Sequence, residues 1–177
     1  TGDAADELFL DYERYLHISK AWSVIKLVPL RNHVAFLLRL IGTSWAQKLS
    51  HKLSAKSLLD LYHKSSWISD ADYFISGRND SYFPNNPLTT NAAINPDCLT
   101  SLSLYDLQTY VPEDINYKVD RATMAYSIEA RSPFLDHILV EKALGLPLED
   151  KIKNGVQKVL LKDWLSSRYR IKSVYRK

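Results

Sequence analysis

The pattern of apolar and polar residues predicts a chain built mostly of helices. Apolar residues recur at helical spacing in residues 21–27, 31–41, 45–53, 55–63, 97–110 and 137–146, and few runs alternate as a strand would. Only five glycines occur, whereas nucleotide-binding α/β proteins usually place several in their strand-to-helix loops. Residues 77–96 are rich in glycine, proline and asparagine, which predicts a long loop.

The most unusual pattern lies in residues 112–136. Pro112 can begin a helix, and the apolar spacing that follows predicts that this helix runs to Ser132, the residue before a proline. Asp136 is expected to cap the next helix. Four charged residues lie beside the apolar stripe: Asp120, Arg121, Glu129 and Arg131. Because buried charges are costly unless paired, they indicate an internal ion network, a lined pocket, or a core helix with structural ion pairs.

Two further segments carry candidate chemistry. Residues 1–15 predict a helix capped by Asp3, with Asp6 and Glu7 in its first turn, where negative charge is favourable. After the turn signal at residues 154–155, a helix is predicted from Val156 to Leu165. Lys158 would lie in its first turn, where a positive charge opposes the helix dipole. That unfavourable placement marks Lys158 as a candidate functional residue.

Composition narrows the class of protein. The 177 residues suffice for one domain, and the net charge of +3, from 23 basic and 20 acidic residues, is too balanced to indicate nucleic-acid or membrane partners. The single cysteine, Cys98, excludes an internal disulfide or a cysteine metal cluster. No apolar run approaches the roughly 20 residues needed to span a bilayer. These features lead us to expect a cytoplasmic protein.

Three segments resemble motifs of the asparagine synthetase (glutamine-hydrolysing) family. KVDRATMAYSIEARSPFLDHILVEKAL is similar to that family's VDR-x-SM, EAR-x-PFLD and following helix, and residues 155–161 are similar to its G-x-x-K-x-[LI]-[LI] segment. Residues 2–12 resemble its SG-[DE]-G-[GS]-DELF-x-GY loop, with two departures: Ala4-Ala5 replaces small or glycine residues, and Leu10-Asp11 replaces Gly-Gly. Alanine tolerates a positive φ poorly.

The resemblance implies an α/β pyrophosphatase-type fold, similar to adenine nucleotide alpha hydrolases. Most strands of its parallel sheet would lie upstream, so residues 1–177 are expected to be a mostly α-helical, C-terminal part of a synthetase domain. The phosphate loop SGG-x-DS and the glutaminase domain are absent from this sequence. The missing N-terminal half is therefore an expected partner, a homodimer is possible, and the isolated chain is expected to expose apolar faces and to be poorly stable.

The implied activity is synthesis of asparagine from aspartate, ATP and glutamine-derived ammonia through a β-aspartyl-adenylate, with Mg²⁺ as cofactor. Lys158 would balance charge on the adenylate and pyrophosphate, and Asp3 would accept a proton from ammonia. Gly2 and Asp3 would border the nucleotide, and Asp6 would bind the metal. The supporting residues around the substrate would be Asp106, Asp120, Arg121, Glu129 and Arg131.

Several alternatives stay open at this point. Asp106 could be a surface carboxylate or the partner of a nearby arginine. The activity could belong to a related ATP-dependent amide or lactam-forming synthetase that shares Asp6 and Lys158. The absence of the phosphate loop from this chain also leaves room for a non-catalytic helical interaction module.

Overall fold

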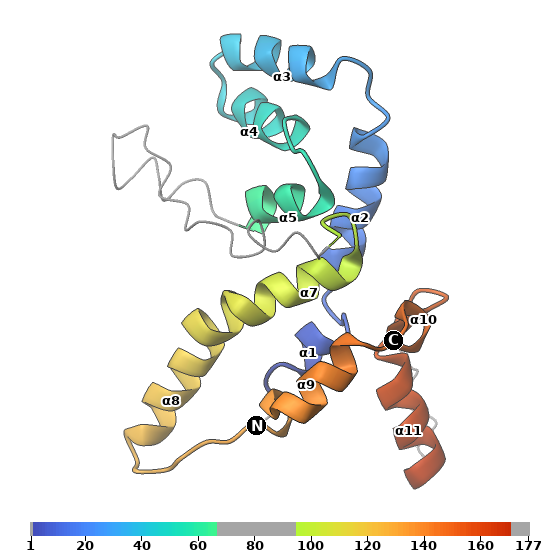
Figure 1. Ribbon diagram of the computed structural model, residues 1–177. Helices are drawn as coiled ribbons and strands as arrows, with labels where there is room; N and C mark the ends of the chain where they lie inside the picture. The colour runs from blue at the N-terminus through green and yellow to red at the C-terminus, as the bar shows by residue number, and fades with distance from the viewer. Residues whose placement is uncertain (1, 67–94, 171–177) are drawn as a thin grey trace. The chain divides into compact units, whose positions relative to one another are not determined.

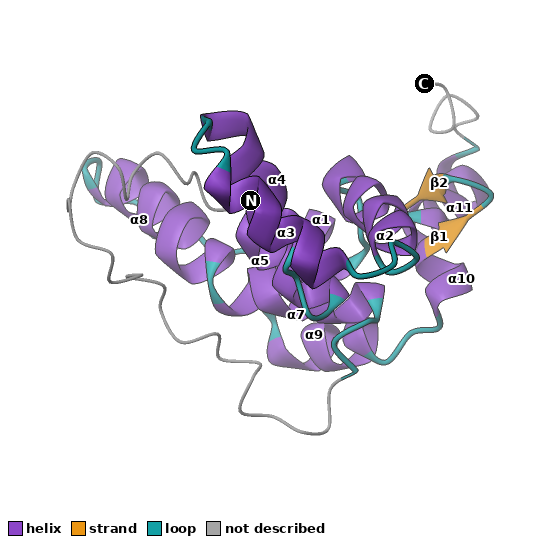
Figure 2. Cartoon of the chain, turned by 90° about the horizontal axis from the view of Figure 1, so that it is seen from above, coloured by secondary structure: helices purple, strands orange, loops and turns teal. Residues whose placement is uncertain are grey.

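The fold is mostly helical, as the sequence predicts (Figures 1 and 2). A computed structural model describes residues 2–66 and 95–170. The helices are α1 (Ala5–Leu8), α2 (Glu13–Ile25), α3 (Arg31–Leu40), α4 (Ser44–Leu53), α5 (Leu58–Ser66), α7 (Leu99–Gln108), α8 (Tyr117–Met124), α9 (His137–Leu144), α10 (Leu148–Lys151) and α11 (Val159–Tyr169). No helix in the described ranges is long and apolar enough to cross a membrane. Residues 77–94 of the predicted loop lie outside those ranges.

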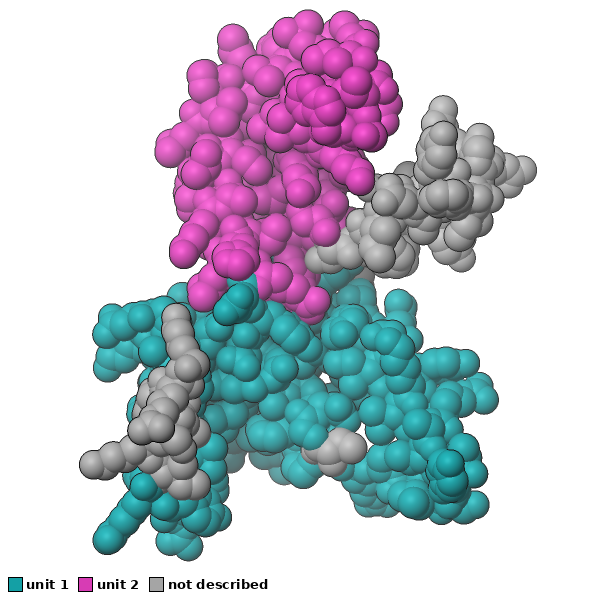
Figure 3. Space-filling model, turned by 180° about the vertical axis from the view of Figure 1, so that it is seen from behind, with its two compact units in different colours: residues 1–13, 102–177 teal, residues 14–101 magenta. Residues whose placement is uncertain are grey.

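The chain divides into two compact units (Figure 3). Unit 1 comprises residues 1–13 and 102–177, and unit 2 comprises residues 14–101. In unit 2, α3 and α4 pack against each other through small residues, because Ala35 and Ala46 are buried. The buried Ser50 hydroxyl donates a hydrogen bond to the Ala35 carbonyl oxygen at 2.7 Å, which fixes the close approach of the two helices.

The core of unit 1 brings two of the recognisable motifs together. Leu8 and Phe9 of the DELF segment form a buried cluster with Ala143 of α9. The rings of Phe9 and Phe134, the latter from the PFLD segment, meet edge to face with centroids 6.3 Å apart. This arrangement is favourable for aromatic pairs. Residues of both motifs are therefore part of the hydrophobic core of unit 1, whatever catalytic role the motifs have.

The expected cap of α9 is confirmed, since Asp136 Oδ1 accepts hydrogen bonds from the amides of Ile138 and Leu139 at 3.0 and 3.3 Å. Capping satisfies amides that have no partner within the helix.

The predicted helix from Val156 is wrong at its start. Strands β1 (Ile152–Lys153) and β2 (Val156–Gln157) form an antiparallel pair around Asn154 and Gly155. Those two residues have φ of 52° and 77°, as a two-residue hairpin turn requires. The hairpin takes Val156 and Gln157 into a strand, so α11 begins only at Val159.

The helix predicted over residues 112–132 is also wrong in length. A π-helix, η2 (Val111–Asn116), leads into α8, which ends at Met124. There the amide of Ser127 bonds the Met124 carbonyl and the amide of Ile128 bonds the Thr123 carbonyl, while Ser127 adopts a φ of 57°. This is the Schellman ending, usually supplied by glycine. Because the sequence has serine instead of glycine at that position, the residue pattern gives no signal that the helix ends there.

The first predicted helix is likewise corrected. Asp3 is not its N-cap: Ala4, with φ of 72°, precedes α1. Leu10, with φ of 56°, follows α1 and separates it from α2. Asp6 and Glu7 do lie in the first turn, as predicted.

Candidate functional site

A polar cluster in unit 1 is built around Lys158. Its ammonium forms an ion pair and hydrogen bond with Asp6 Oδ1 and lies 2.9 Å from Asp11 Oδ2. Lys158 is the N-cap of α11, with φ of 54°, and not part of its first turn. Its side chain is 23% exposed, whereas those of Asp6 and Asp11 are 41% and 32% exposed. The cluster is thus partly open to solvent and accessible to a polar ligand.

Two hydrogen bonds from distant segments hold residues 2–12, the segment that carries Asp6. Gln157 donates from Nε2 to the Leu10 carbonyl oxygen at 2.7 Å. Ser132 donates from Oγ to the Asp3 carbonyl oxygen, also at 2.7 Å. Both bonds join residues more than 125 positions apart, since the separations are 147 and 129. The three resembling segments therefore meet at one loop.

Lys158 is held in its charged form. Burial disfavours the ammonium, but the hydrogen bonds and the negative charges of Asp6 and Asp11 outweigh it, so the pKa of Lys158 is raised above its usual value. Because the usual value is already about 10.4, Lys158 is cationic at neutral pH. It can therefore supply a fixed positive charge.

A second polar pair lies in the same segment, residues 2–12. Glu7 is buried, and Tyr12 donates a hydrogen bond from its hydroxyl to Glu7 Oε1 at 2.9 Å. Burial, with smaller contributions from Asp6 and Asp106, raises the pKa of Glu7. Burial and the bond to Glu7 raise the pKa of the Tyr12 hydroxyl. Asp106 is itself only 3% exposed, so it is not the surface carboxylate that was one expectation.

The structure does not bring together the four charged residues of the 112–136 segment. Glu129 and Arg131 pair at 2.9 Å, but their side chains are 70% and 83% exposed. Asp120 and Arg121 are also exposed, and the Arg121 guanidinium lies 5.1 Å from the centre of the Tyr117 ring. The expectations of an internal ion network and of a core helix are therefore wrong for this chain, because Glu129 and Arg131 pair in exposed positions and α8 has no buried residues. The lined pocket stays a prediction.

Gly2 and Asp3 lie at the edge of the loop. Gly2 is exposed, and a Cβ added to it would meet no atom within 4 Å. Packing in this chain therefore does not require glycine at position 2. Asp3 is half-buried and contributes its carbonyl oxygen to the bond with Ser132.

The donor set is compatible with only part of a magnesium site. Asp6 and Asp11 offer carboxylate oxygens, the ligands that Mg²⁺ prefers, and Mg²⁺ is commonly held by one or two carboxylates plus substrate phosphates. Among the described residues, no group of three or more Asp, Glu, His or Cys side chains is arranged to hold a metal. Asp6 therefore fits a metal that takes its remaining ligands from elsewhere.

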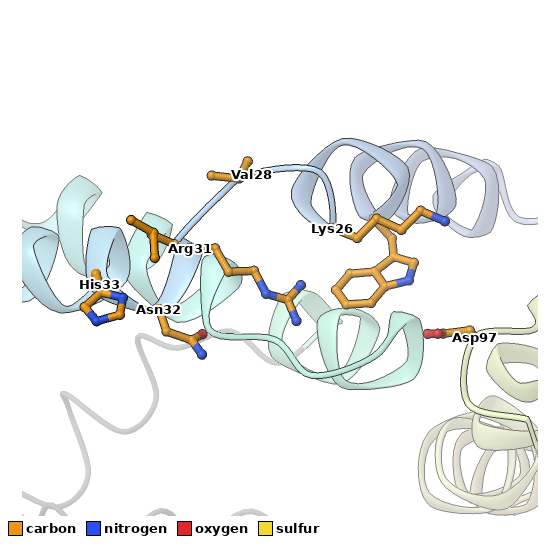
Figure 4. Close-up of a pocket in the computed structure, with 8 residues that line it drawn as sticks. Lys26, Val28, Arg31, Asn32, His33 and Asp97 are labelled. Atoms are coloured by element: carbon orange, nitrogen blue, oxygen red, sulfur yellow. The ribbon is translucent and has the colours of Figure 1, made fainter.

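A pocket in unit 2 contains none of the predicted site residues (Figure 4). Its lining includes Lys26, Arg31, His33 and Asp97. The Arg31 guanidinium lies 5.1 Å from the centre of the Trp22 ring, at cation–π distance.

Comparison with known proteins decides the family. The Asparagine synthase family profile matches residues 1–177. The chain belongs to the asparagine synthase family. Asparagine synthetase [glutamine-hydrolyzing] 1 of Bacillus subtilis (strain 168) is 41% identical over 64 residues, which are 36% of this chain and 10% of that protein. No solved structure matches the chain.

Two vertebrate relatives agree with this assignment. Asparagine synthetase [glutamine-hydrolyzing] of Gallus gallus is 37% identical over 83 residues, or 46% of this chain and 13% of that protein. The Homo sapiens protein of the same name is 47% identical over 47 residues, or 26% of this chain and 8% of that protein. The chain thus covers about a tenth of the length of the relatives it matches.

Sequence reasoning missed three residues of the Lys158 cluster and its supporting hydrogen bonds. Asp11 was visible as a departure from Gly-Gly, but its pairing with Lys158 spans 147 positions and leaves no local signal. Gln157 stands beside Lys158, and Ser132 is expected from the sequence only to end a helix. A polar residue next to a motif is a weak signal, because most such residues are solvated.

Proposed function

We propose that this chain supplies the lysine-bearing side of the site in an ATP-dependent asparagine synthetase. The observation that carries the proposal is the placement of Lys158 between Asp6 and Asp11. A cation held by two partly exposed carboxylates can exchange one of them for a phosphate oxygen without a large movement. Family membership supports the choice of substrates.

In the proposed reaction, the side-chain carboxylate of aspartate attacks the α-phosphorus of ATP, and pyrophosphate leaves. Ammonia then attacks the carbonyl carbon of the β-aspartyl-adenylate, and AMP leaves as asparagine forms. The Lys158 ammonium stabilises the negative charge that develops on phosphate oxygens, an effect that is large when the charge is fixed in advance. Asp3 accepts a proton from the attacking ammonia.

Asp6, with Asp11 beside it, would hold Mg²⁺ together with the phosphates of ATP. Magnesium bound there would neutralise phosphate charge and favour departure of pyrophosphate. The hydrogen bonds from Gln157 and Ser132 keep the carboxylates at their positions. The remaining ligands and the nucleotide pocket would come from the N-terminal half of the synthetase.

The test compares Lys158→Ala with Lys153→Ala, a control lysine that is exposed in the neighbouring hairpin. Pyrophosphate release from ATP, aspartate and Mg²⁺ is measured for this chain mixed with the N-terminal half. Loss of one fixed charge-stabilising group is expected to lower the rate by about 10²–10³. Lys153→Ala should retain the wild-type rate.

Product analysis separates the alternatives. Asparagine as the product supports the proposal. Another amide or a lactam would assign a related synthetase. If the mixture is folded by circular dichroism but releases no pyrophosphate, the proposal is overturned in favour of a non-catalytic module.

A further inference from the structure

Two residues that the proposed chemistry does not use lie next to the partners of Lys158. Glu7 follows Asp6 in α1, and Tyr12 follows Asp11. Neighbouring side chains differ in environment, since that of Asp6 is 41% exposed whereas Glu7 is only 1% exposed. Each carboxylate that binds Lys158 is therefore joined through the backbone to one member of a second polar pair.

A hydrogen bond within this second pair bridges the turn that joins α1 to α2. The Tyr12 hydroxyl donates to Glu7 Oε1 at 2.9 Å. The backbone of the same turn is closed as well, because the Asp11 amide donates to the Asp6 carbonyl oxygen at 2.9 Å. Leu10, inside the turn, is buried and has φ of 56°, a conformation that an L-residue keeps only when its surroundings hold it. The Glu7–Tyr12 bond is a side-chain restraint of that kind.

Stability alone is a poor reason to bury a carboxyl group at position 7. Removing a carboxyl from water costs free energy unless hydrogen bonds replace its hydration. Even when its hydrogen bonds are made, a buried polar pair often contributes no more stability than apolar residues of the same shape. A hydrogen bond does have a defined length and direction, which apolar packing lacks. The bond between Glu7 and Tyr12 can therefore determine where the turn places its neighbours.

We propose that Glu7 and Tyr12 are positioning residues, which hold the carboxylates of Asp6 and Asp11 where both can bind Lys158. The Lys158 ammonium lies 2.9 Å from Asp11 Oδ2. A shift of the turn by about 1 Å would lengthen that contact beyond hydrogen-bond distance. The consequence for the reaction rests on the proposed function, whereas the consequence for the ion pairs does not.

Three variants separate positioning from stabilisation. Tyr12→Phe and Glu7→Leu each remove one end of the bond and leave the other without it, which should destabilise the protein. Glu7→Leu/Tyr12→Phe removes both ends and should be more stable than Tyr12→Phe, because the buried carboxyl is gone as well. The matched control is Tyr62→Phe, which removes the hydroxyl of another buried tyrosine, in α5 of unit 2.

Two measurements are made on each variant, and urea unfolding gives its stability. The first is pyrophosphate release by the chain mixed with the N-terminal half, with kcat and the KM for aspartate determined separately. The second is the side-chain ammonium signal of Lys158 in ¹⁵N–¹H NMR of the full 177-residue chain, assigned by its loss in Lys158→Ala. That signal is observed while ion pairs and hydrogen bonds keep the ammonium protons from exchanging rapidly with water.

All three variants should lower kcat by about 10- to 100-fold with little change in KM, because a misplaced charge is lost mainly in the transition state. They should also weaken or abolish the Lys158 signal. Tyr62→Phe should change neither measurement. The double variant decides between the two roles, since its stability recovers while its kcat and its Lys158 signal do not.

A double variant with the wild-type kcat would overturn the proposal, because the pair would then only stabilise the fold. A Lys158 signal that is unchanged in Tyr12→Phe and in the double variant would overturn it too, as would the absence of this signal from the wild-type chain. If the wild-type mixture releases no pyrophosphate, the proposed function fails. The Lys158 signal then decides by itself whether Glu7 and Tyr12 position the cluster.

Discussion

Ala4 should be under backbone strain that its neighbour Ala5 does not share. Ala4 has φ of 72° and ψ of −6°, a left-handed conformation, whereas Ala5 is the first residue of α1. Both are buried, at 1% and 8% exposed. The left-handed conformation costs an L-residue roughly 1–2 kcal/mol, and glycine avoids that cost. Ala4→Gly and Ala5→Gly therefore form a matched pair of substitutions.

The expected free energies of unfolding follow from three contributions. Each substitution removes one buried methyl group, worth about 0.8 kcal/mol, and gives the unfolded chain extra freedom worth about 0.4–1 kcal/mol. Ala5→Gly gains nothing in return and should destabilise the protein by about 1–2 kcal/mol. Ala4→Gly also relieves the strain and should be close to neutral. The difference between the two variants, about 1–2 kcal/mol, measures the strain itself.

Urea unfolding monitored by circular dichroism measures the difference. Hydrogen exchange of the Leu8 and Phe9 amides localises it, because these amides bond the carbonyls of Ala4 and Ala5 at 3.0 and 3.1 Å. Equal destabilisation by both substitutions would refute the argument, since it would show that Ala4 carries no strain. A large loss for Ala4→Gly alone would show that its methyl group matters more than its backbone.

Three further predictions concern capping, the hairpin and pH. Asp136→Ala removes the cap of α9 and should lower the free energy of unfolding by about 1 kcal/mol in urea titrations, whereas Asp136→Asn should lose little. Gly155→Ala places a side chain at φ of 77° and should cost about 1–2 kcal/mol in the same assay, although open space surrounds the position. Burial lowers the pKa of His63 below its usual 6.5; the negative charge of Asp60 opposes this shift, and the positive charge of Lys64 adds a smaller contribution in the same direction as burial. A lowered folded-state pKa gives stability that is complete above about pH 6.5 and is lost as the pH falls through the folded value. The urea midpoint should therefore drop from pH 7.5 to 5.5, and less steeply in His63→Gln; equal slopes would contradict this.

The sequence correctly predicts those features of the fold that depend on residues only a few positions apart. The helices around residues 31–41, 97–110 and 137–146, the cap at Asp136 and the turn at residues 154–155 follow from spacing, capping and turn chemistry within a few positions. The errors arose where a non-glycine residue took a left-handed conformation, as at Ala4, Ser127 and Lys158. Each of them ends or begins a helix where the sequence shows no glycine.

The site required information that no local pattern contains. Lys158 was singled out because a lysine in the first turn of a helix opposes the dipole, yet the structure places it just before that turn. The underlying reasoning still holds, since a lysine at a helix N-terminus needs compensating negative charge, and Asp6 and Asp11 supply it from 152 and 147 positions away. Electrostatics could therefore predict that Lys158 has acidic partners. Only the folded chain could show that one of them is Asp11, which belongs to one of the two departures of this segment from the family pattern.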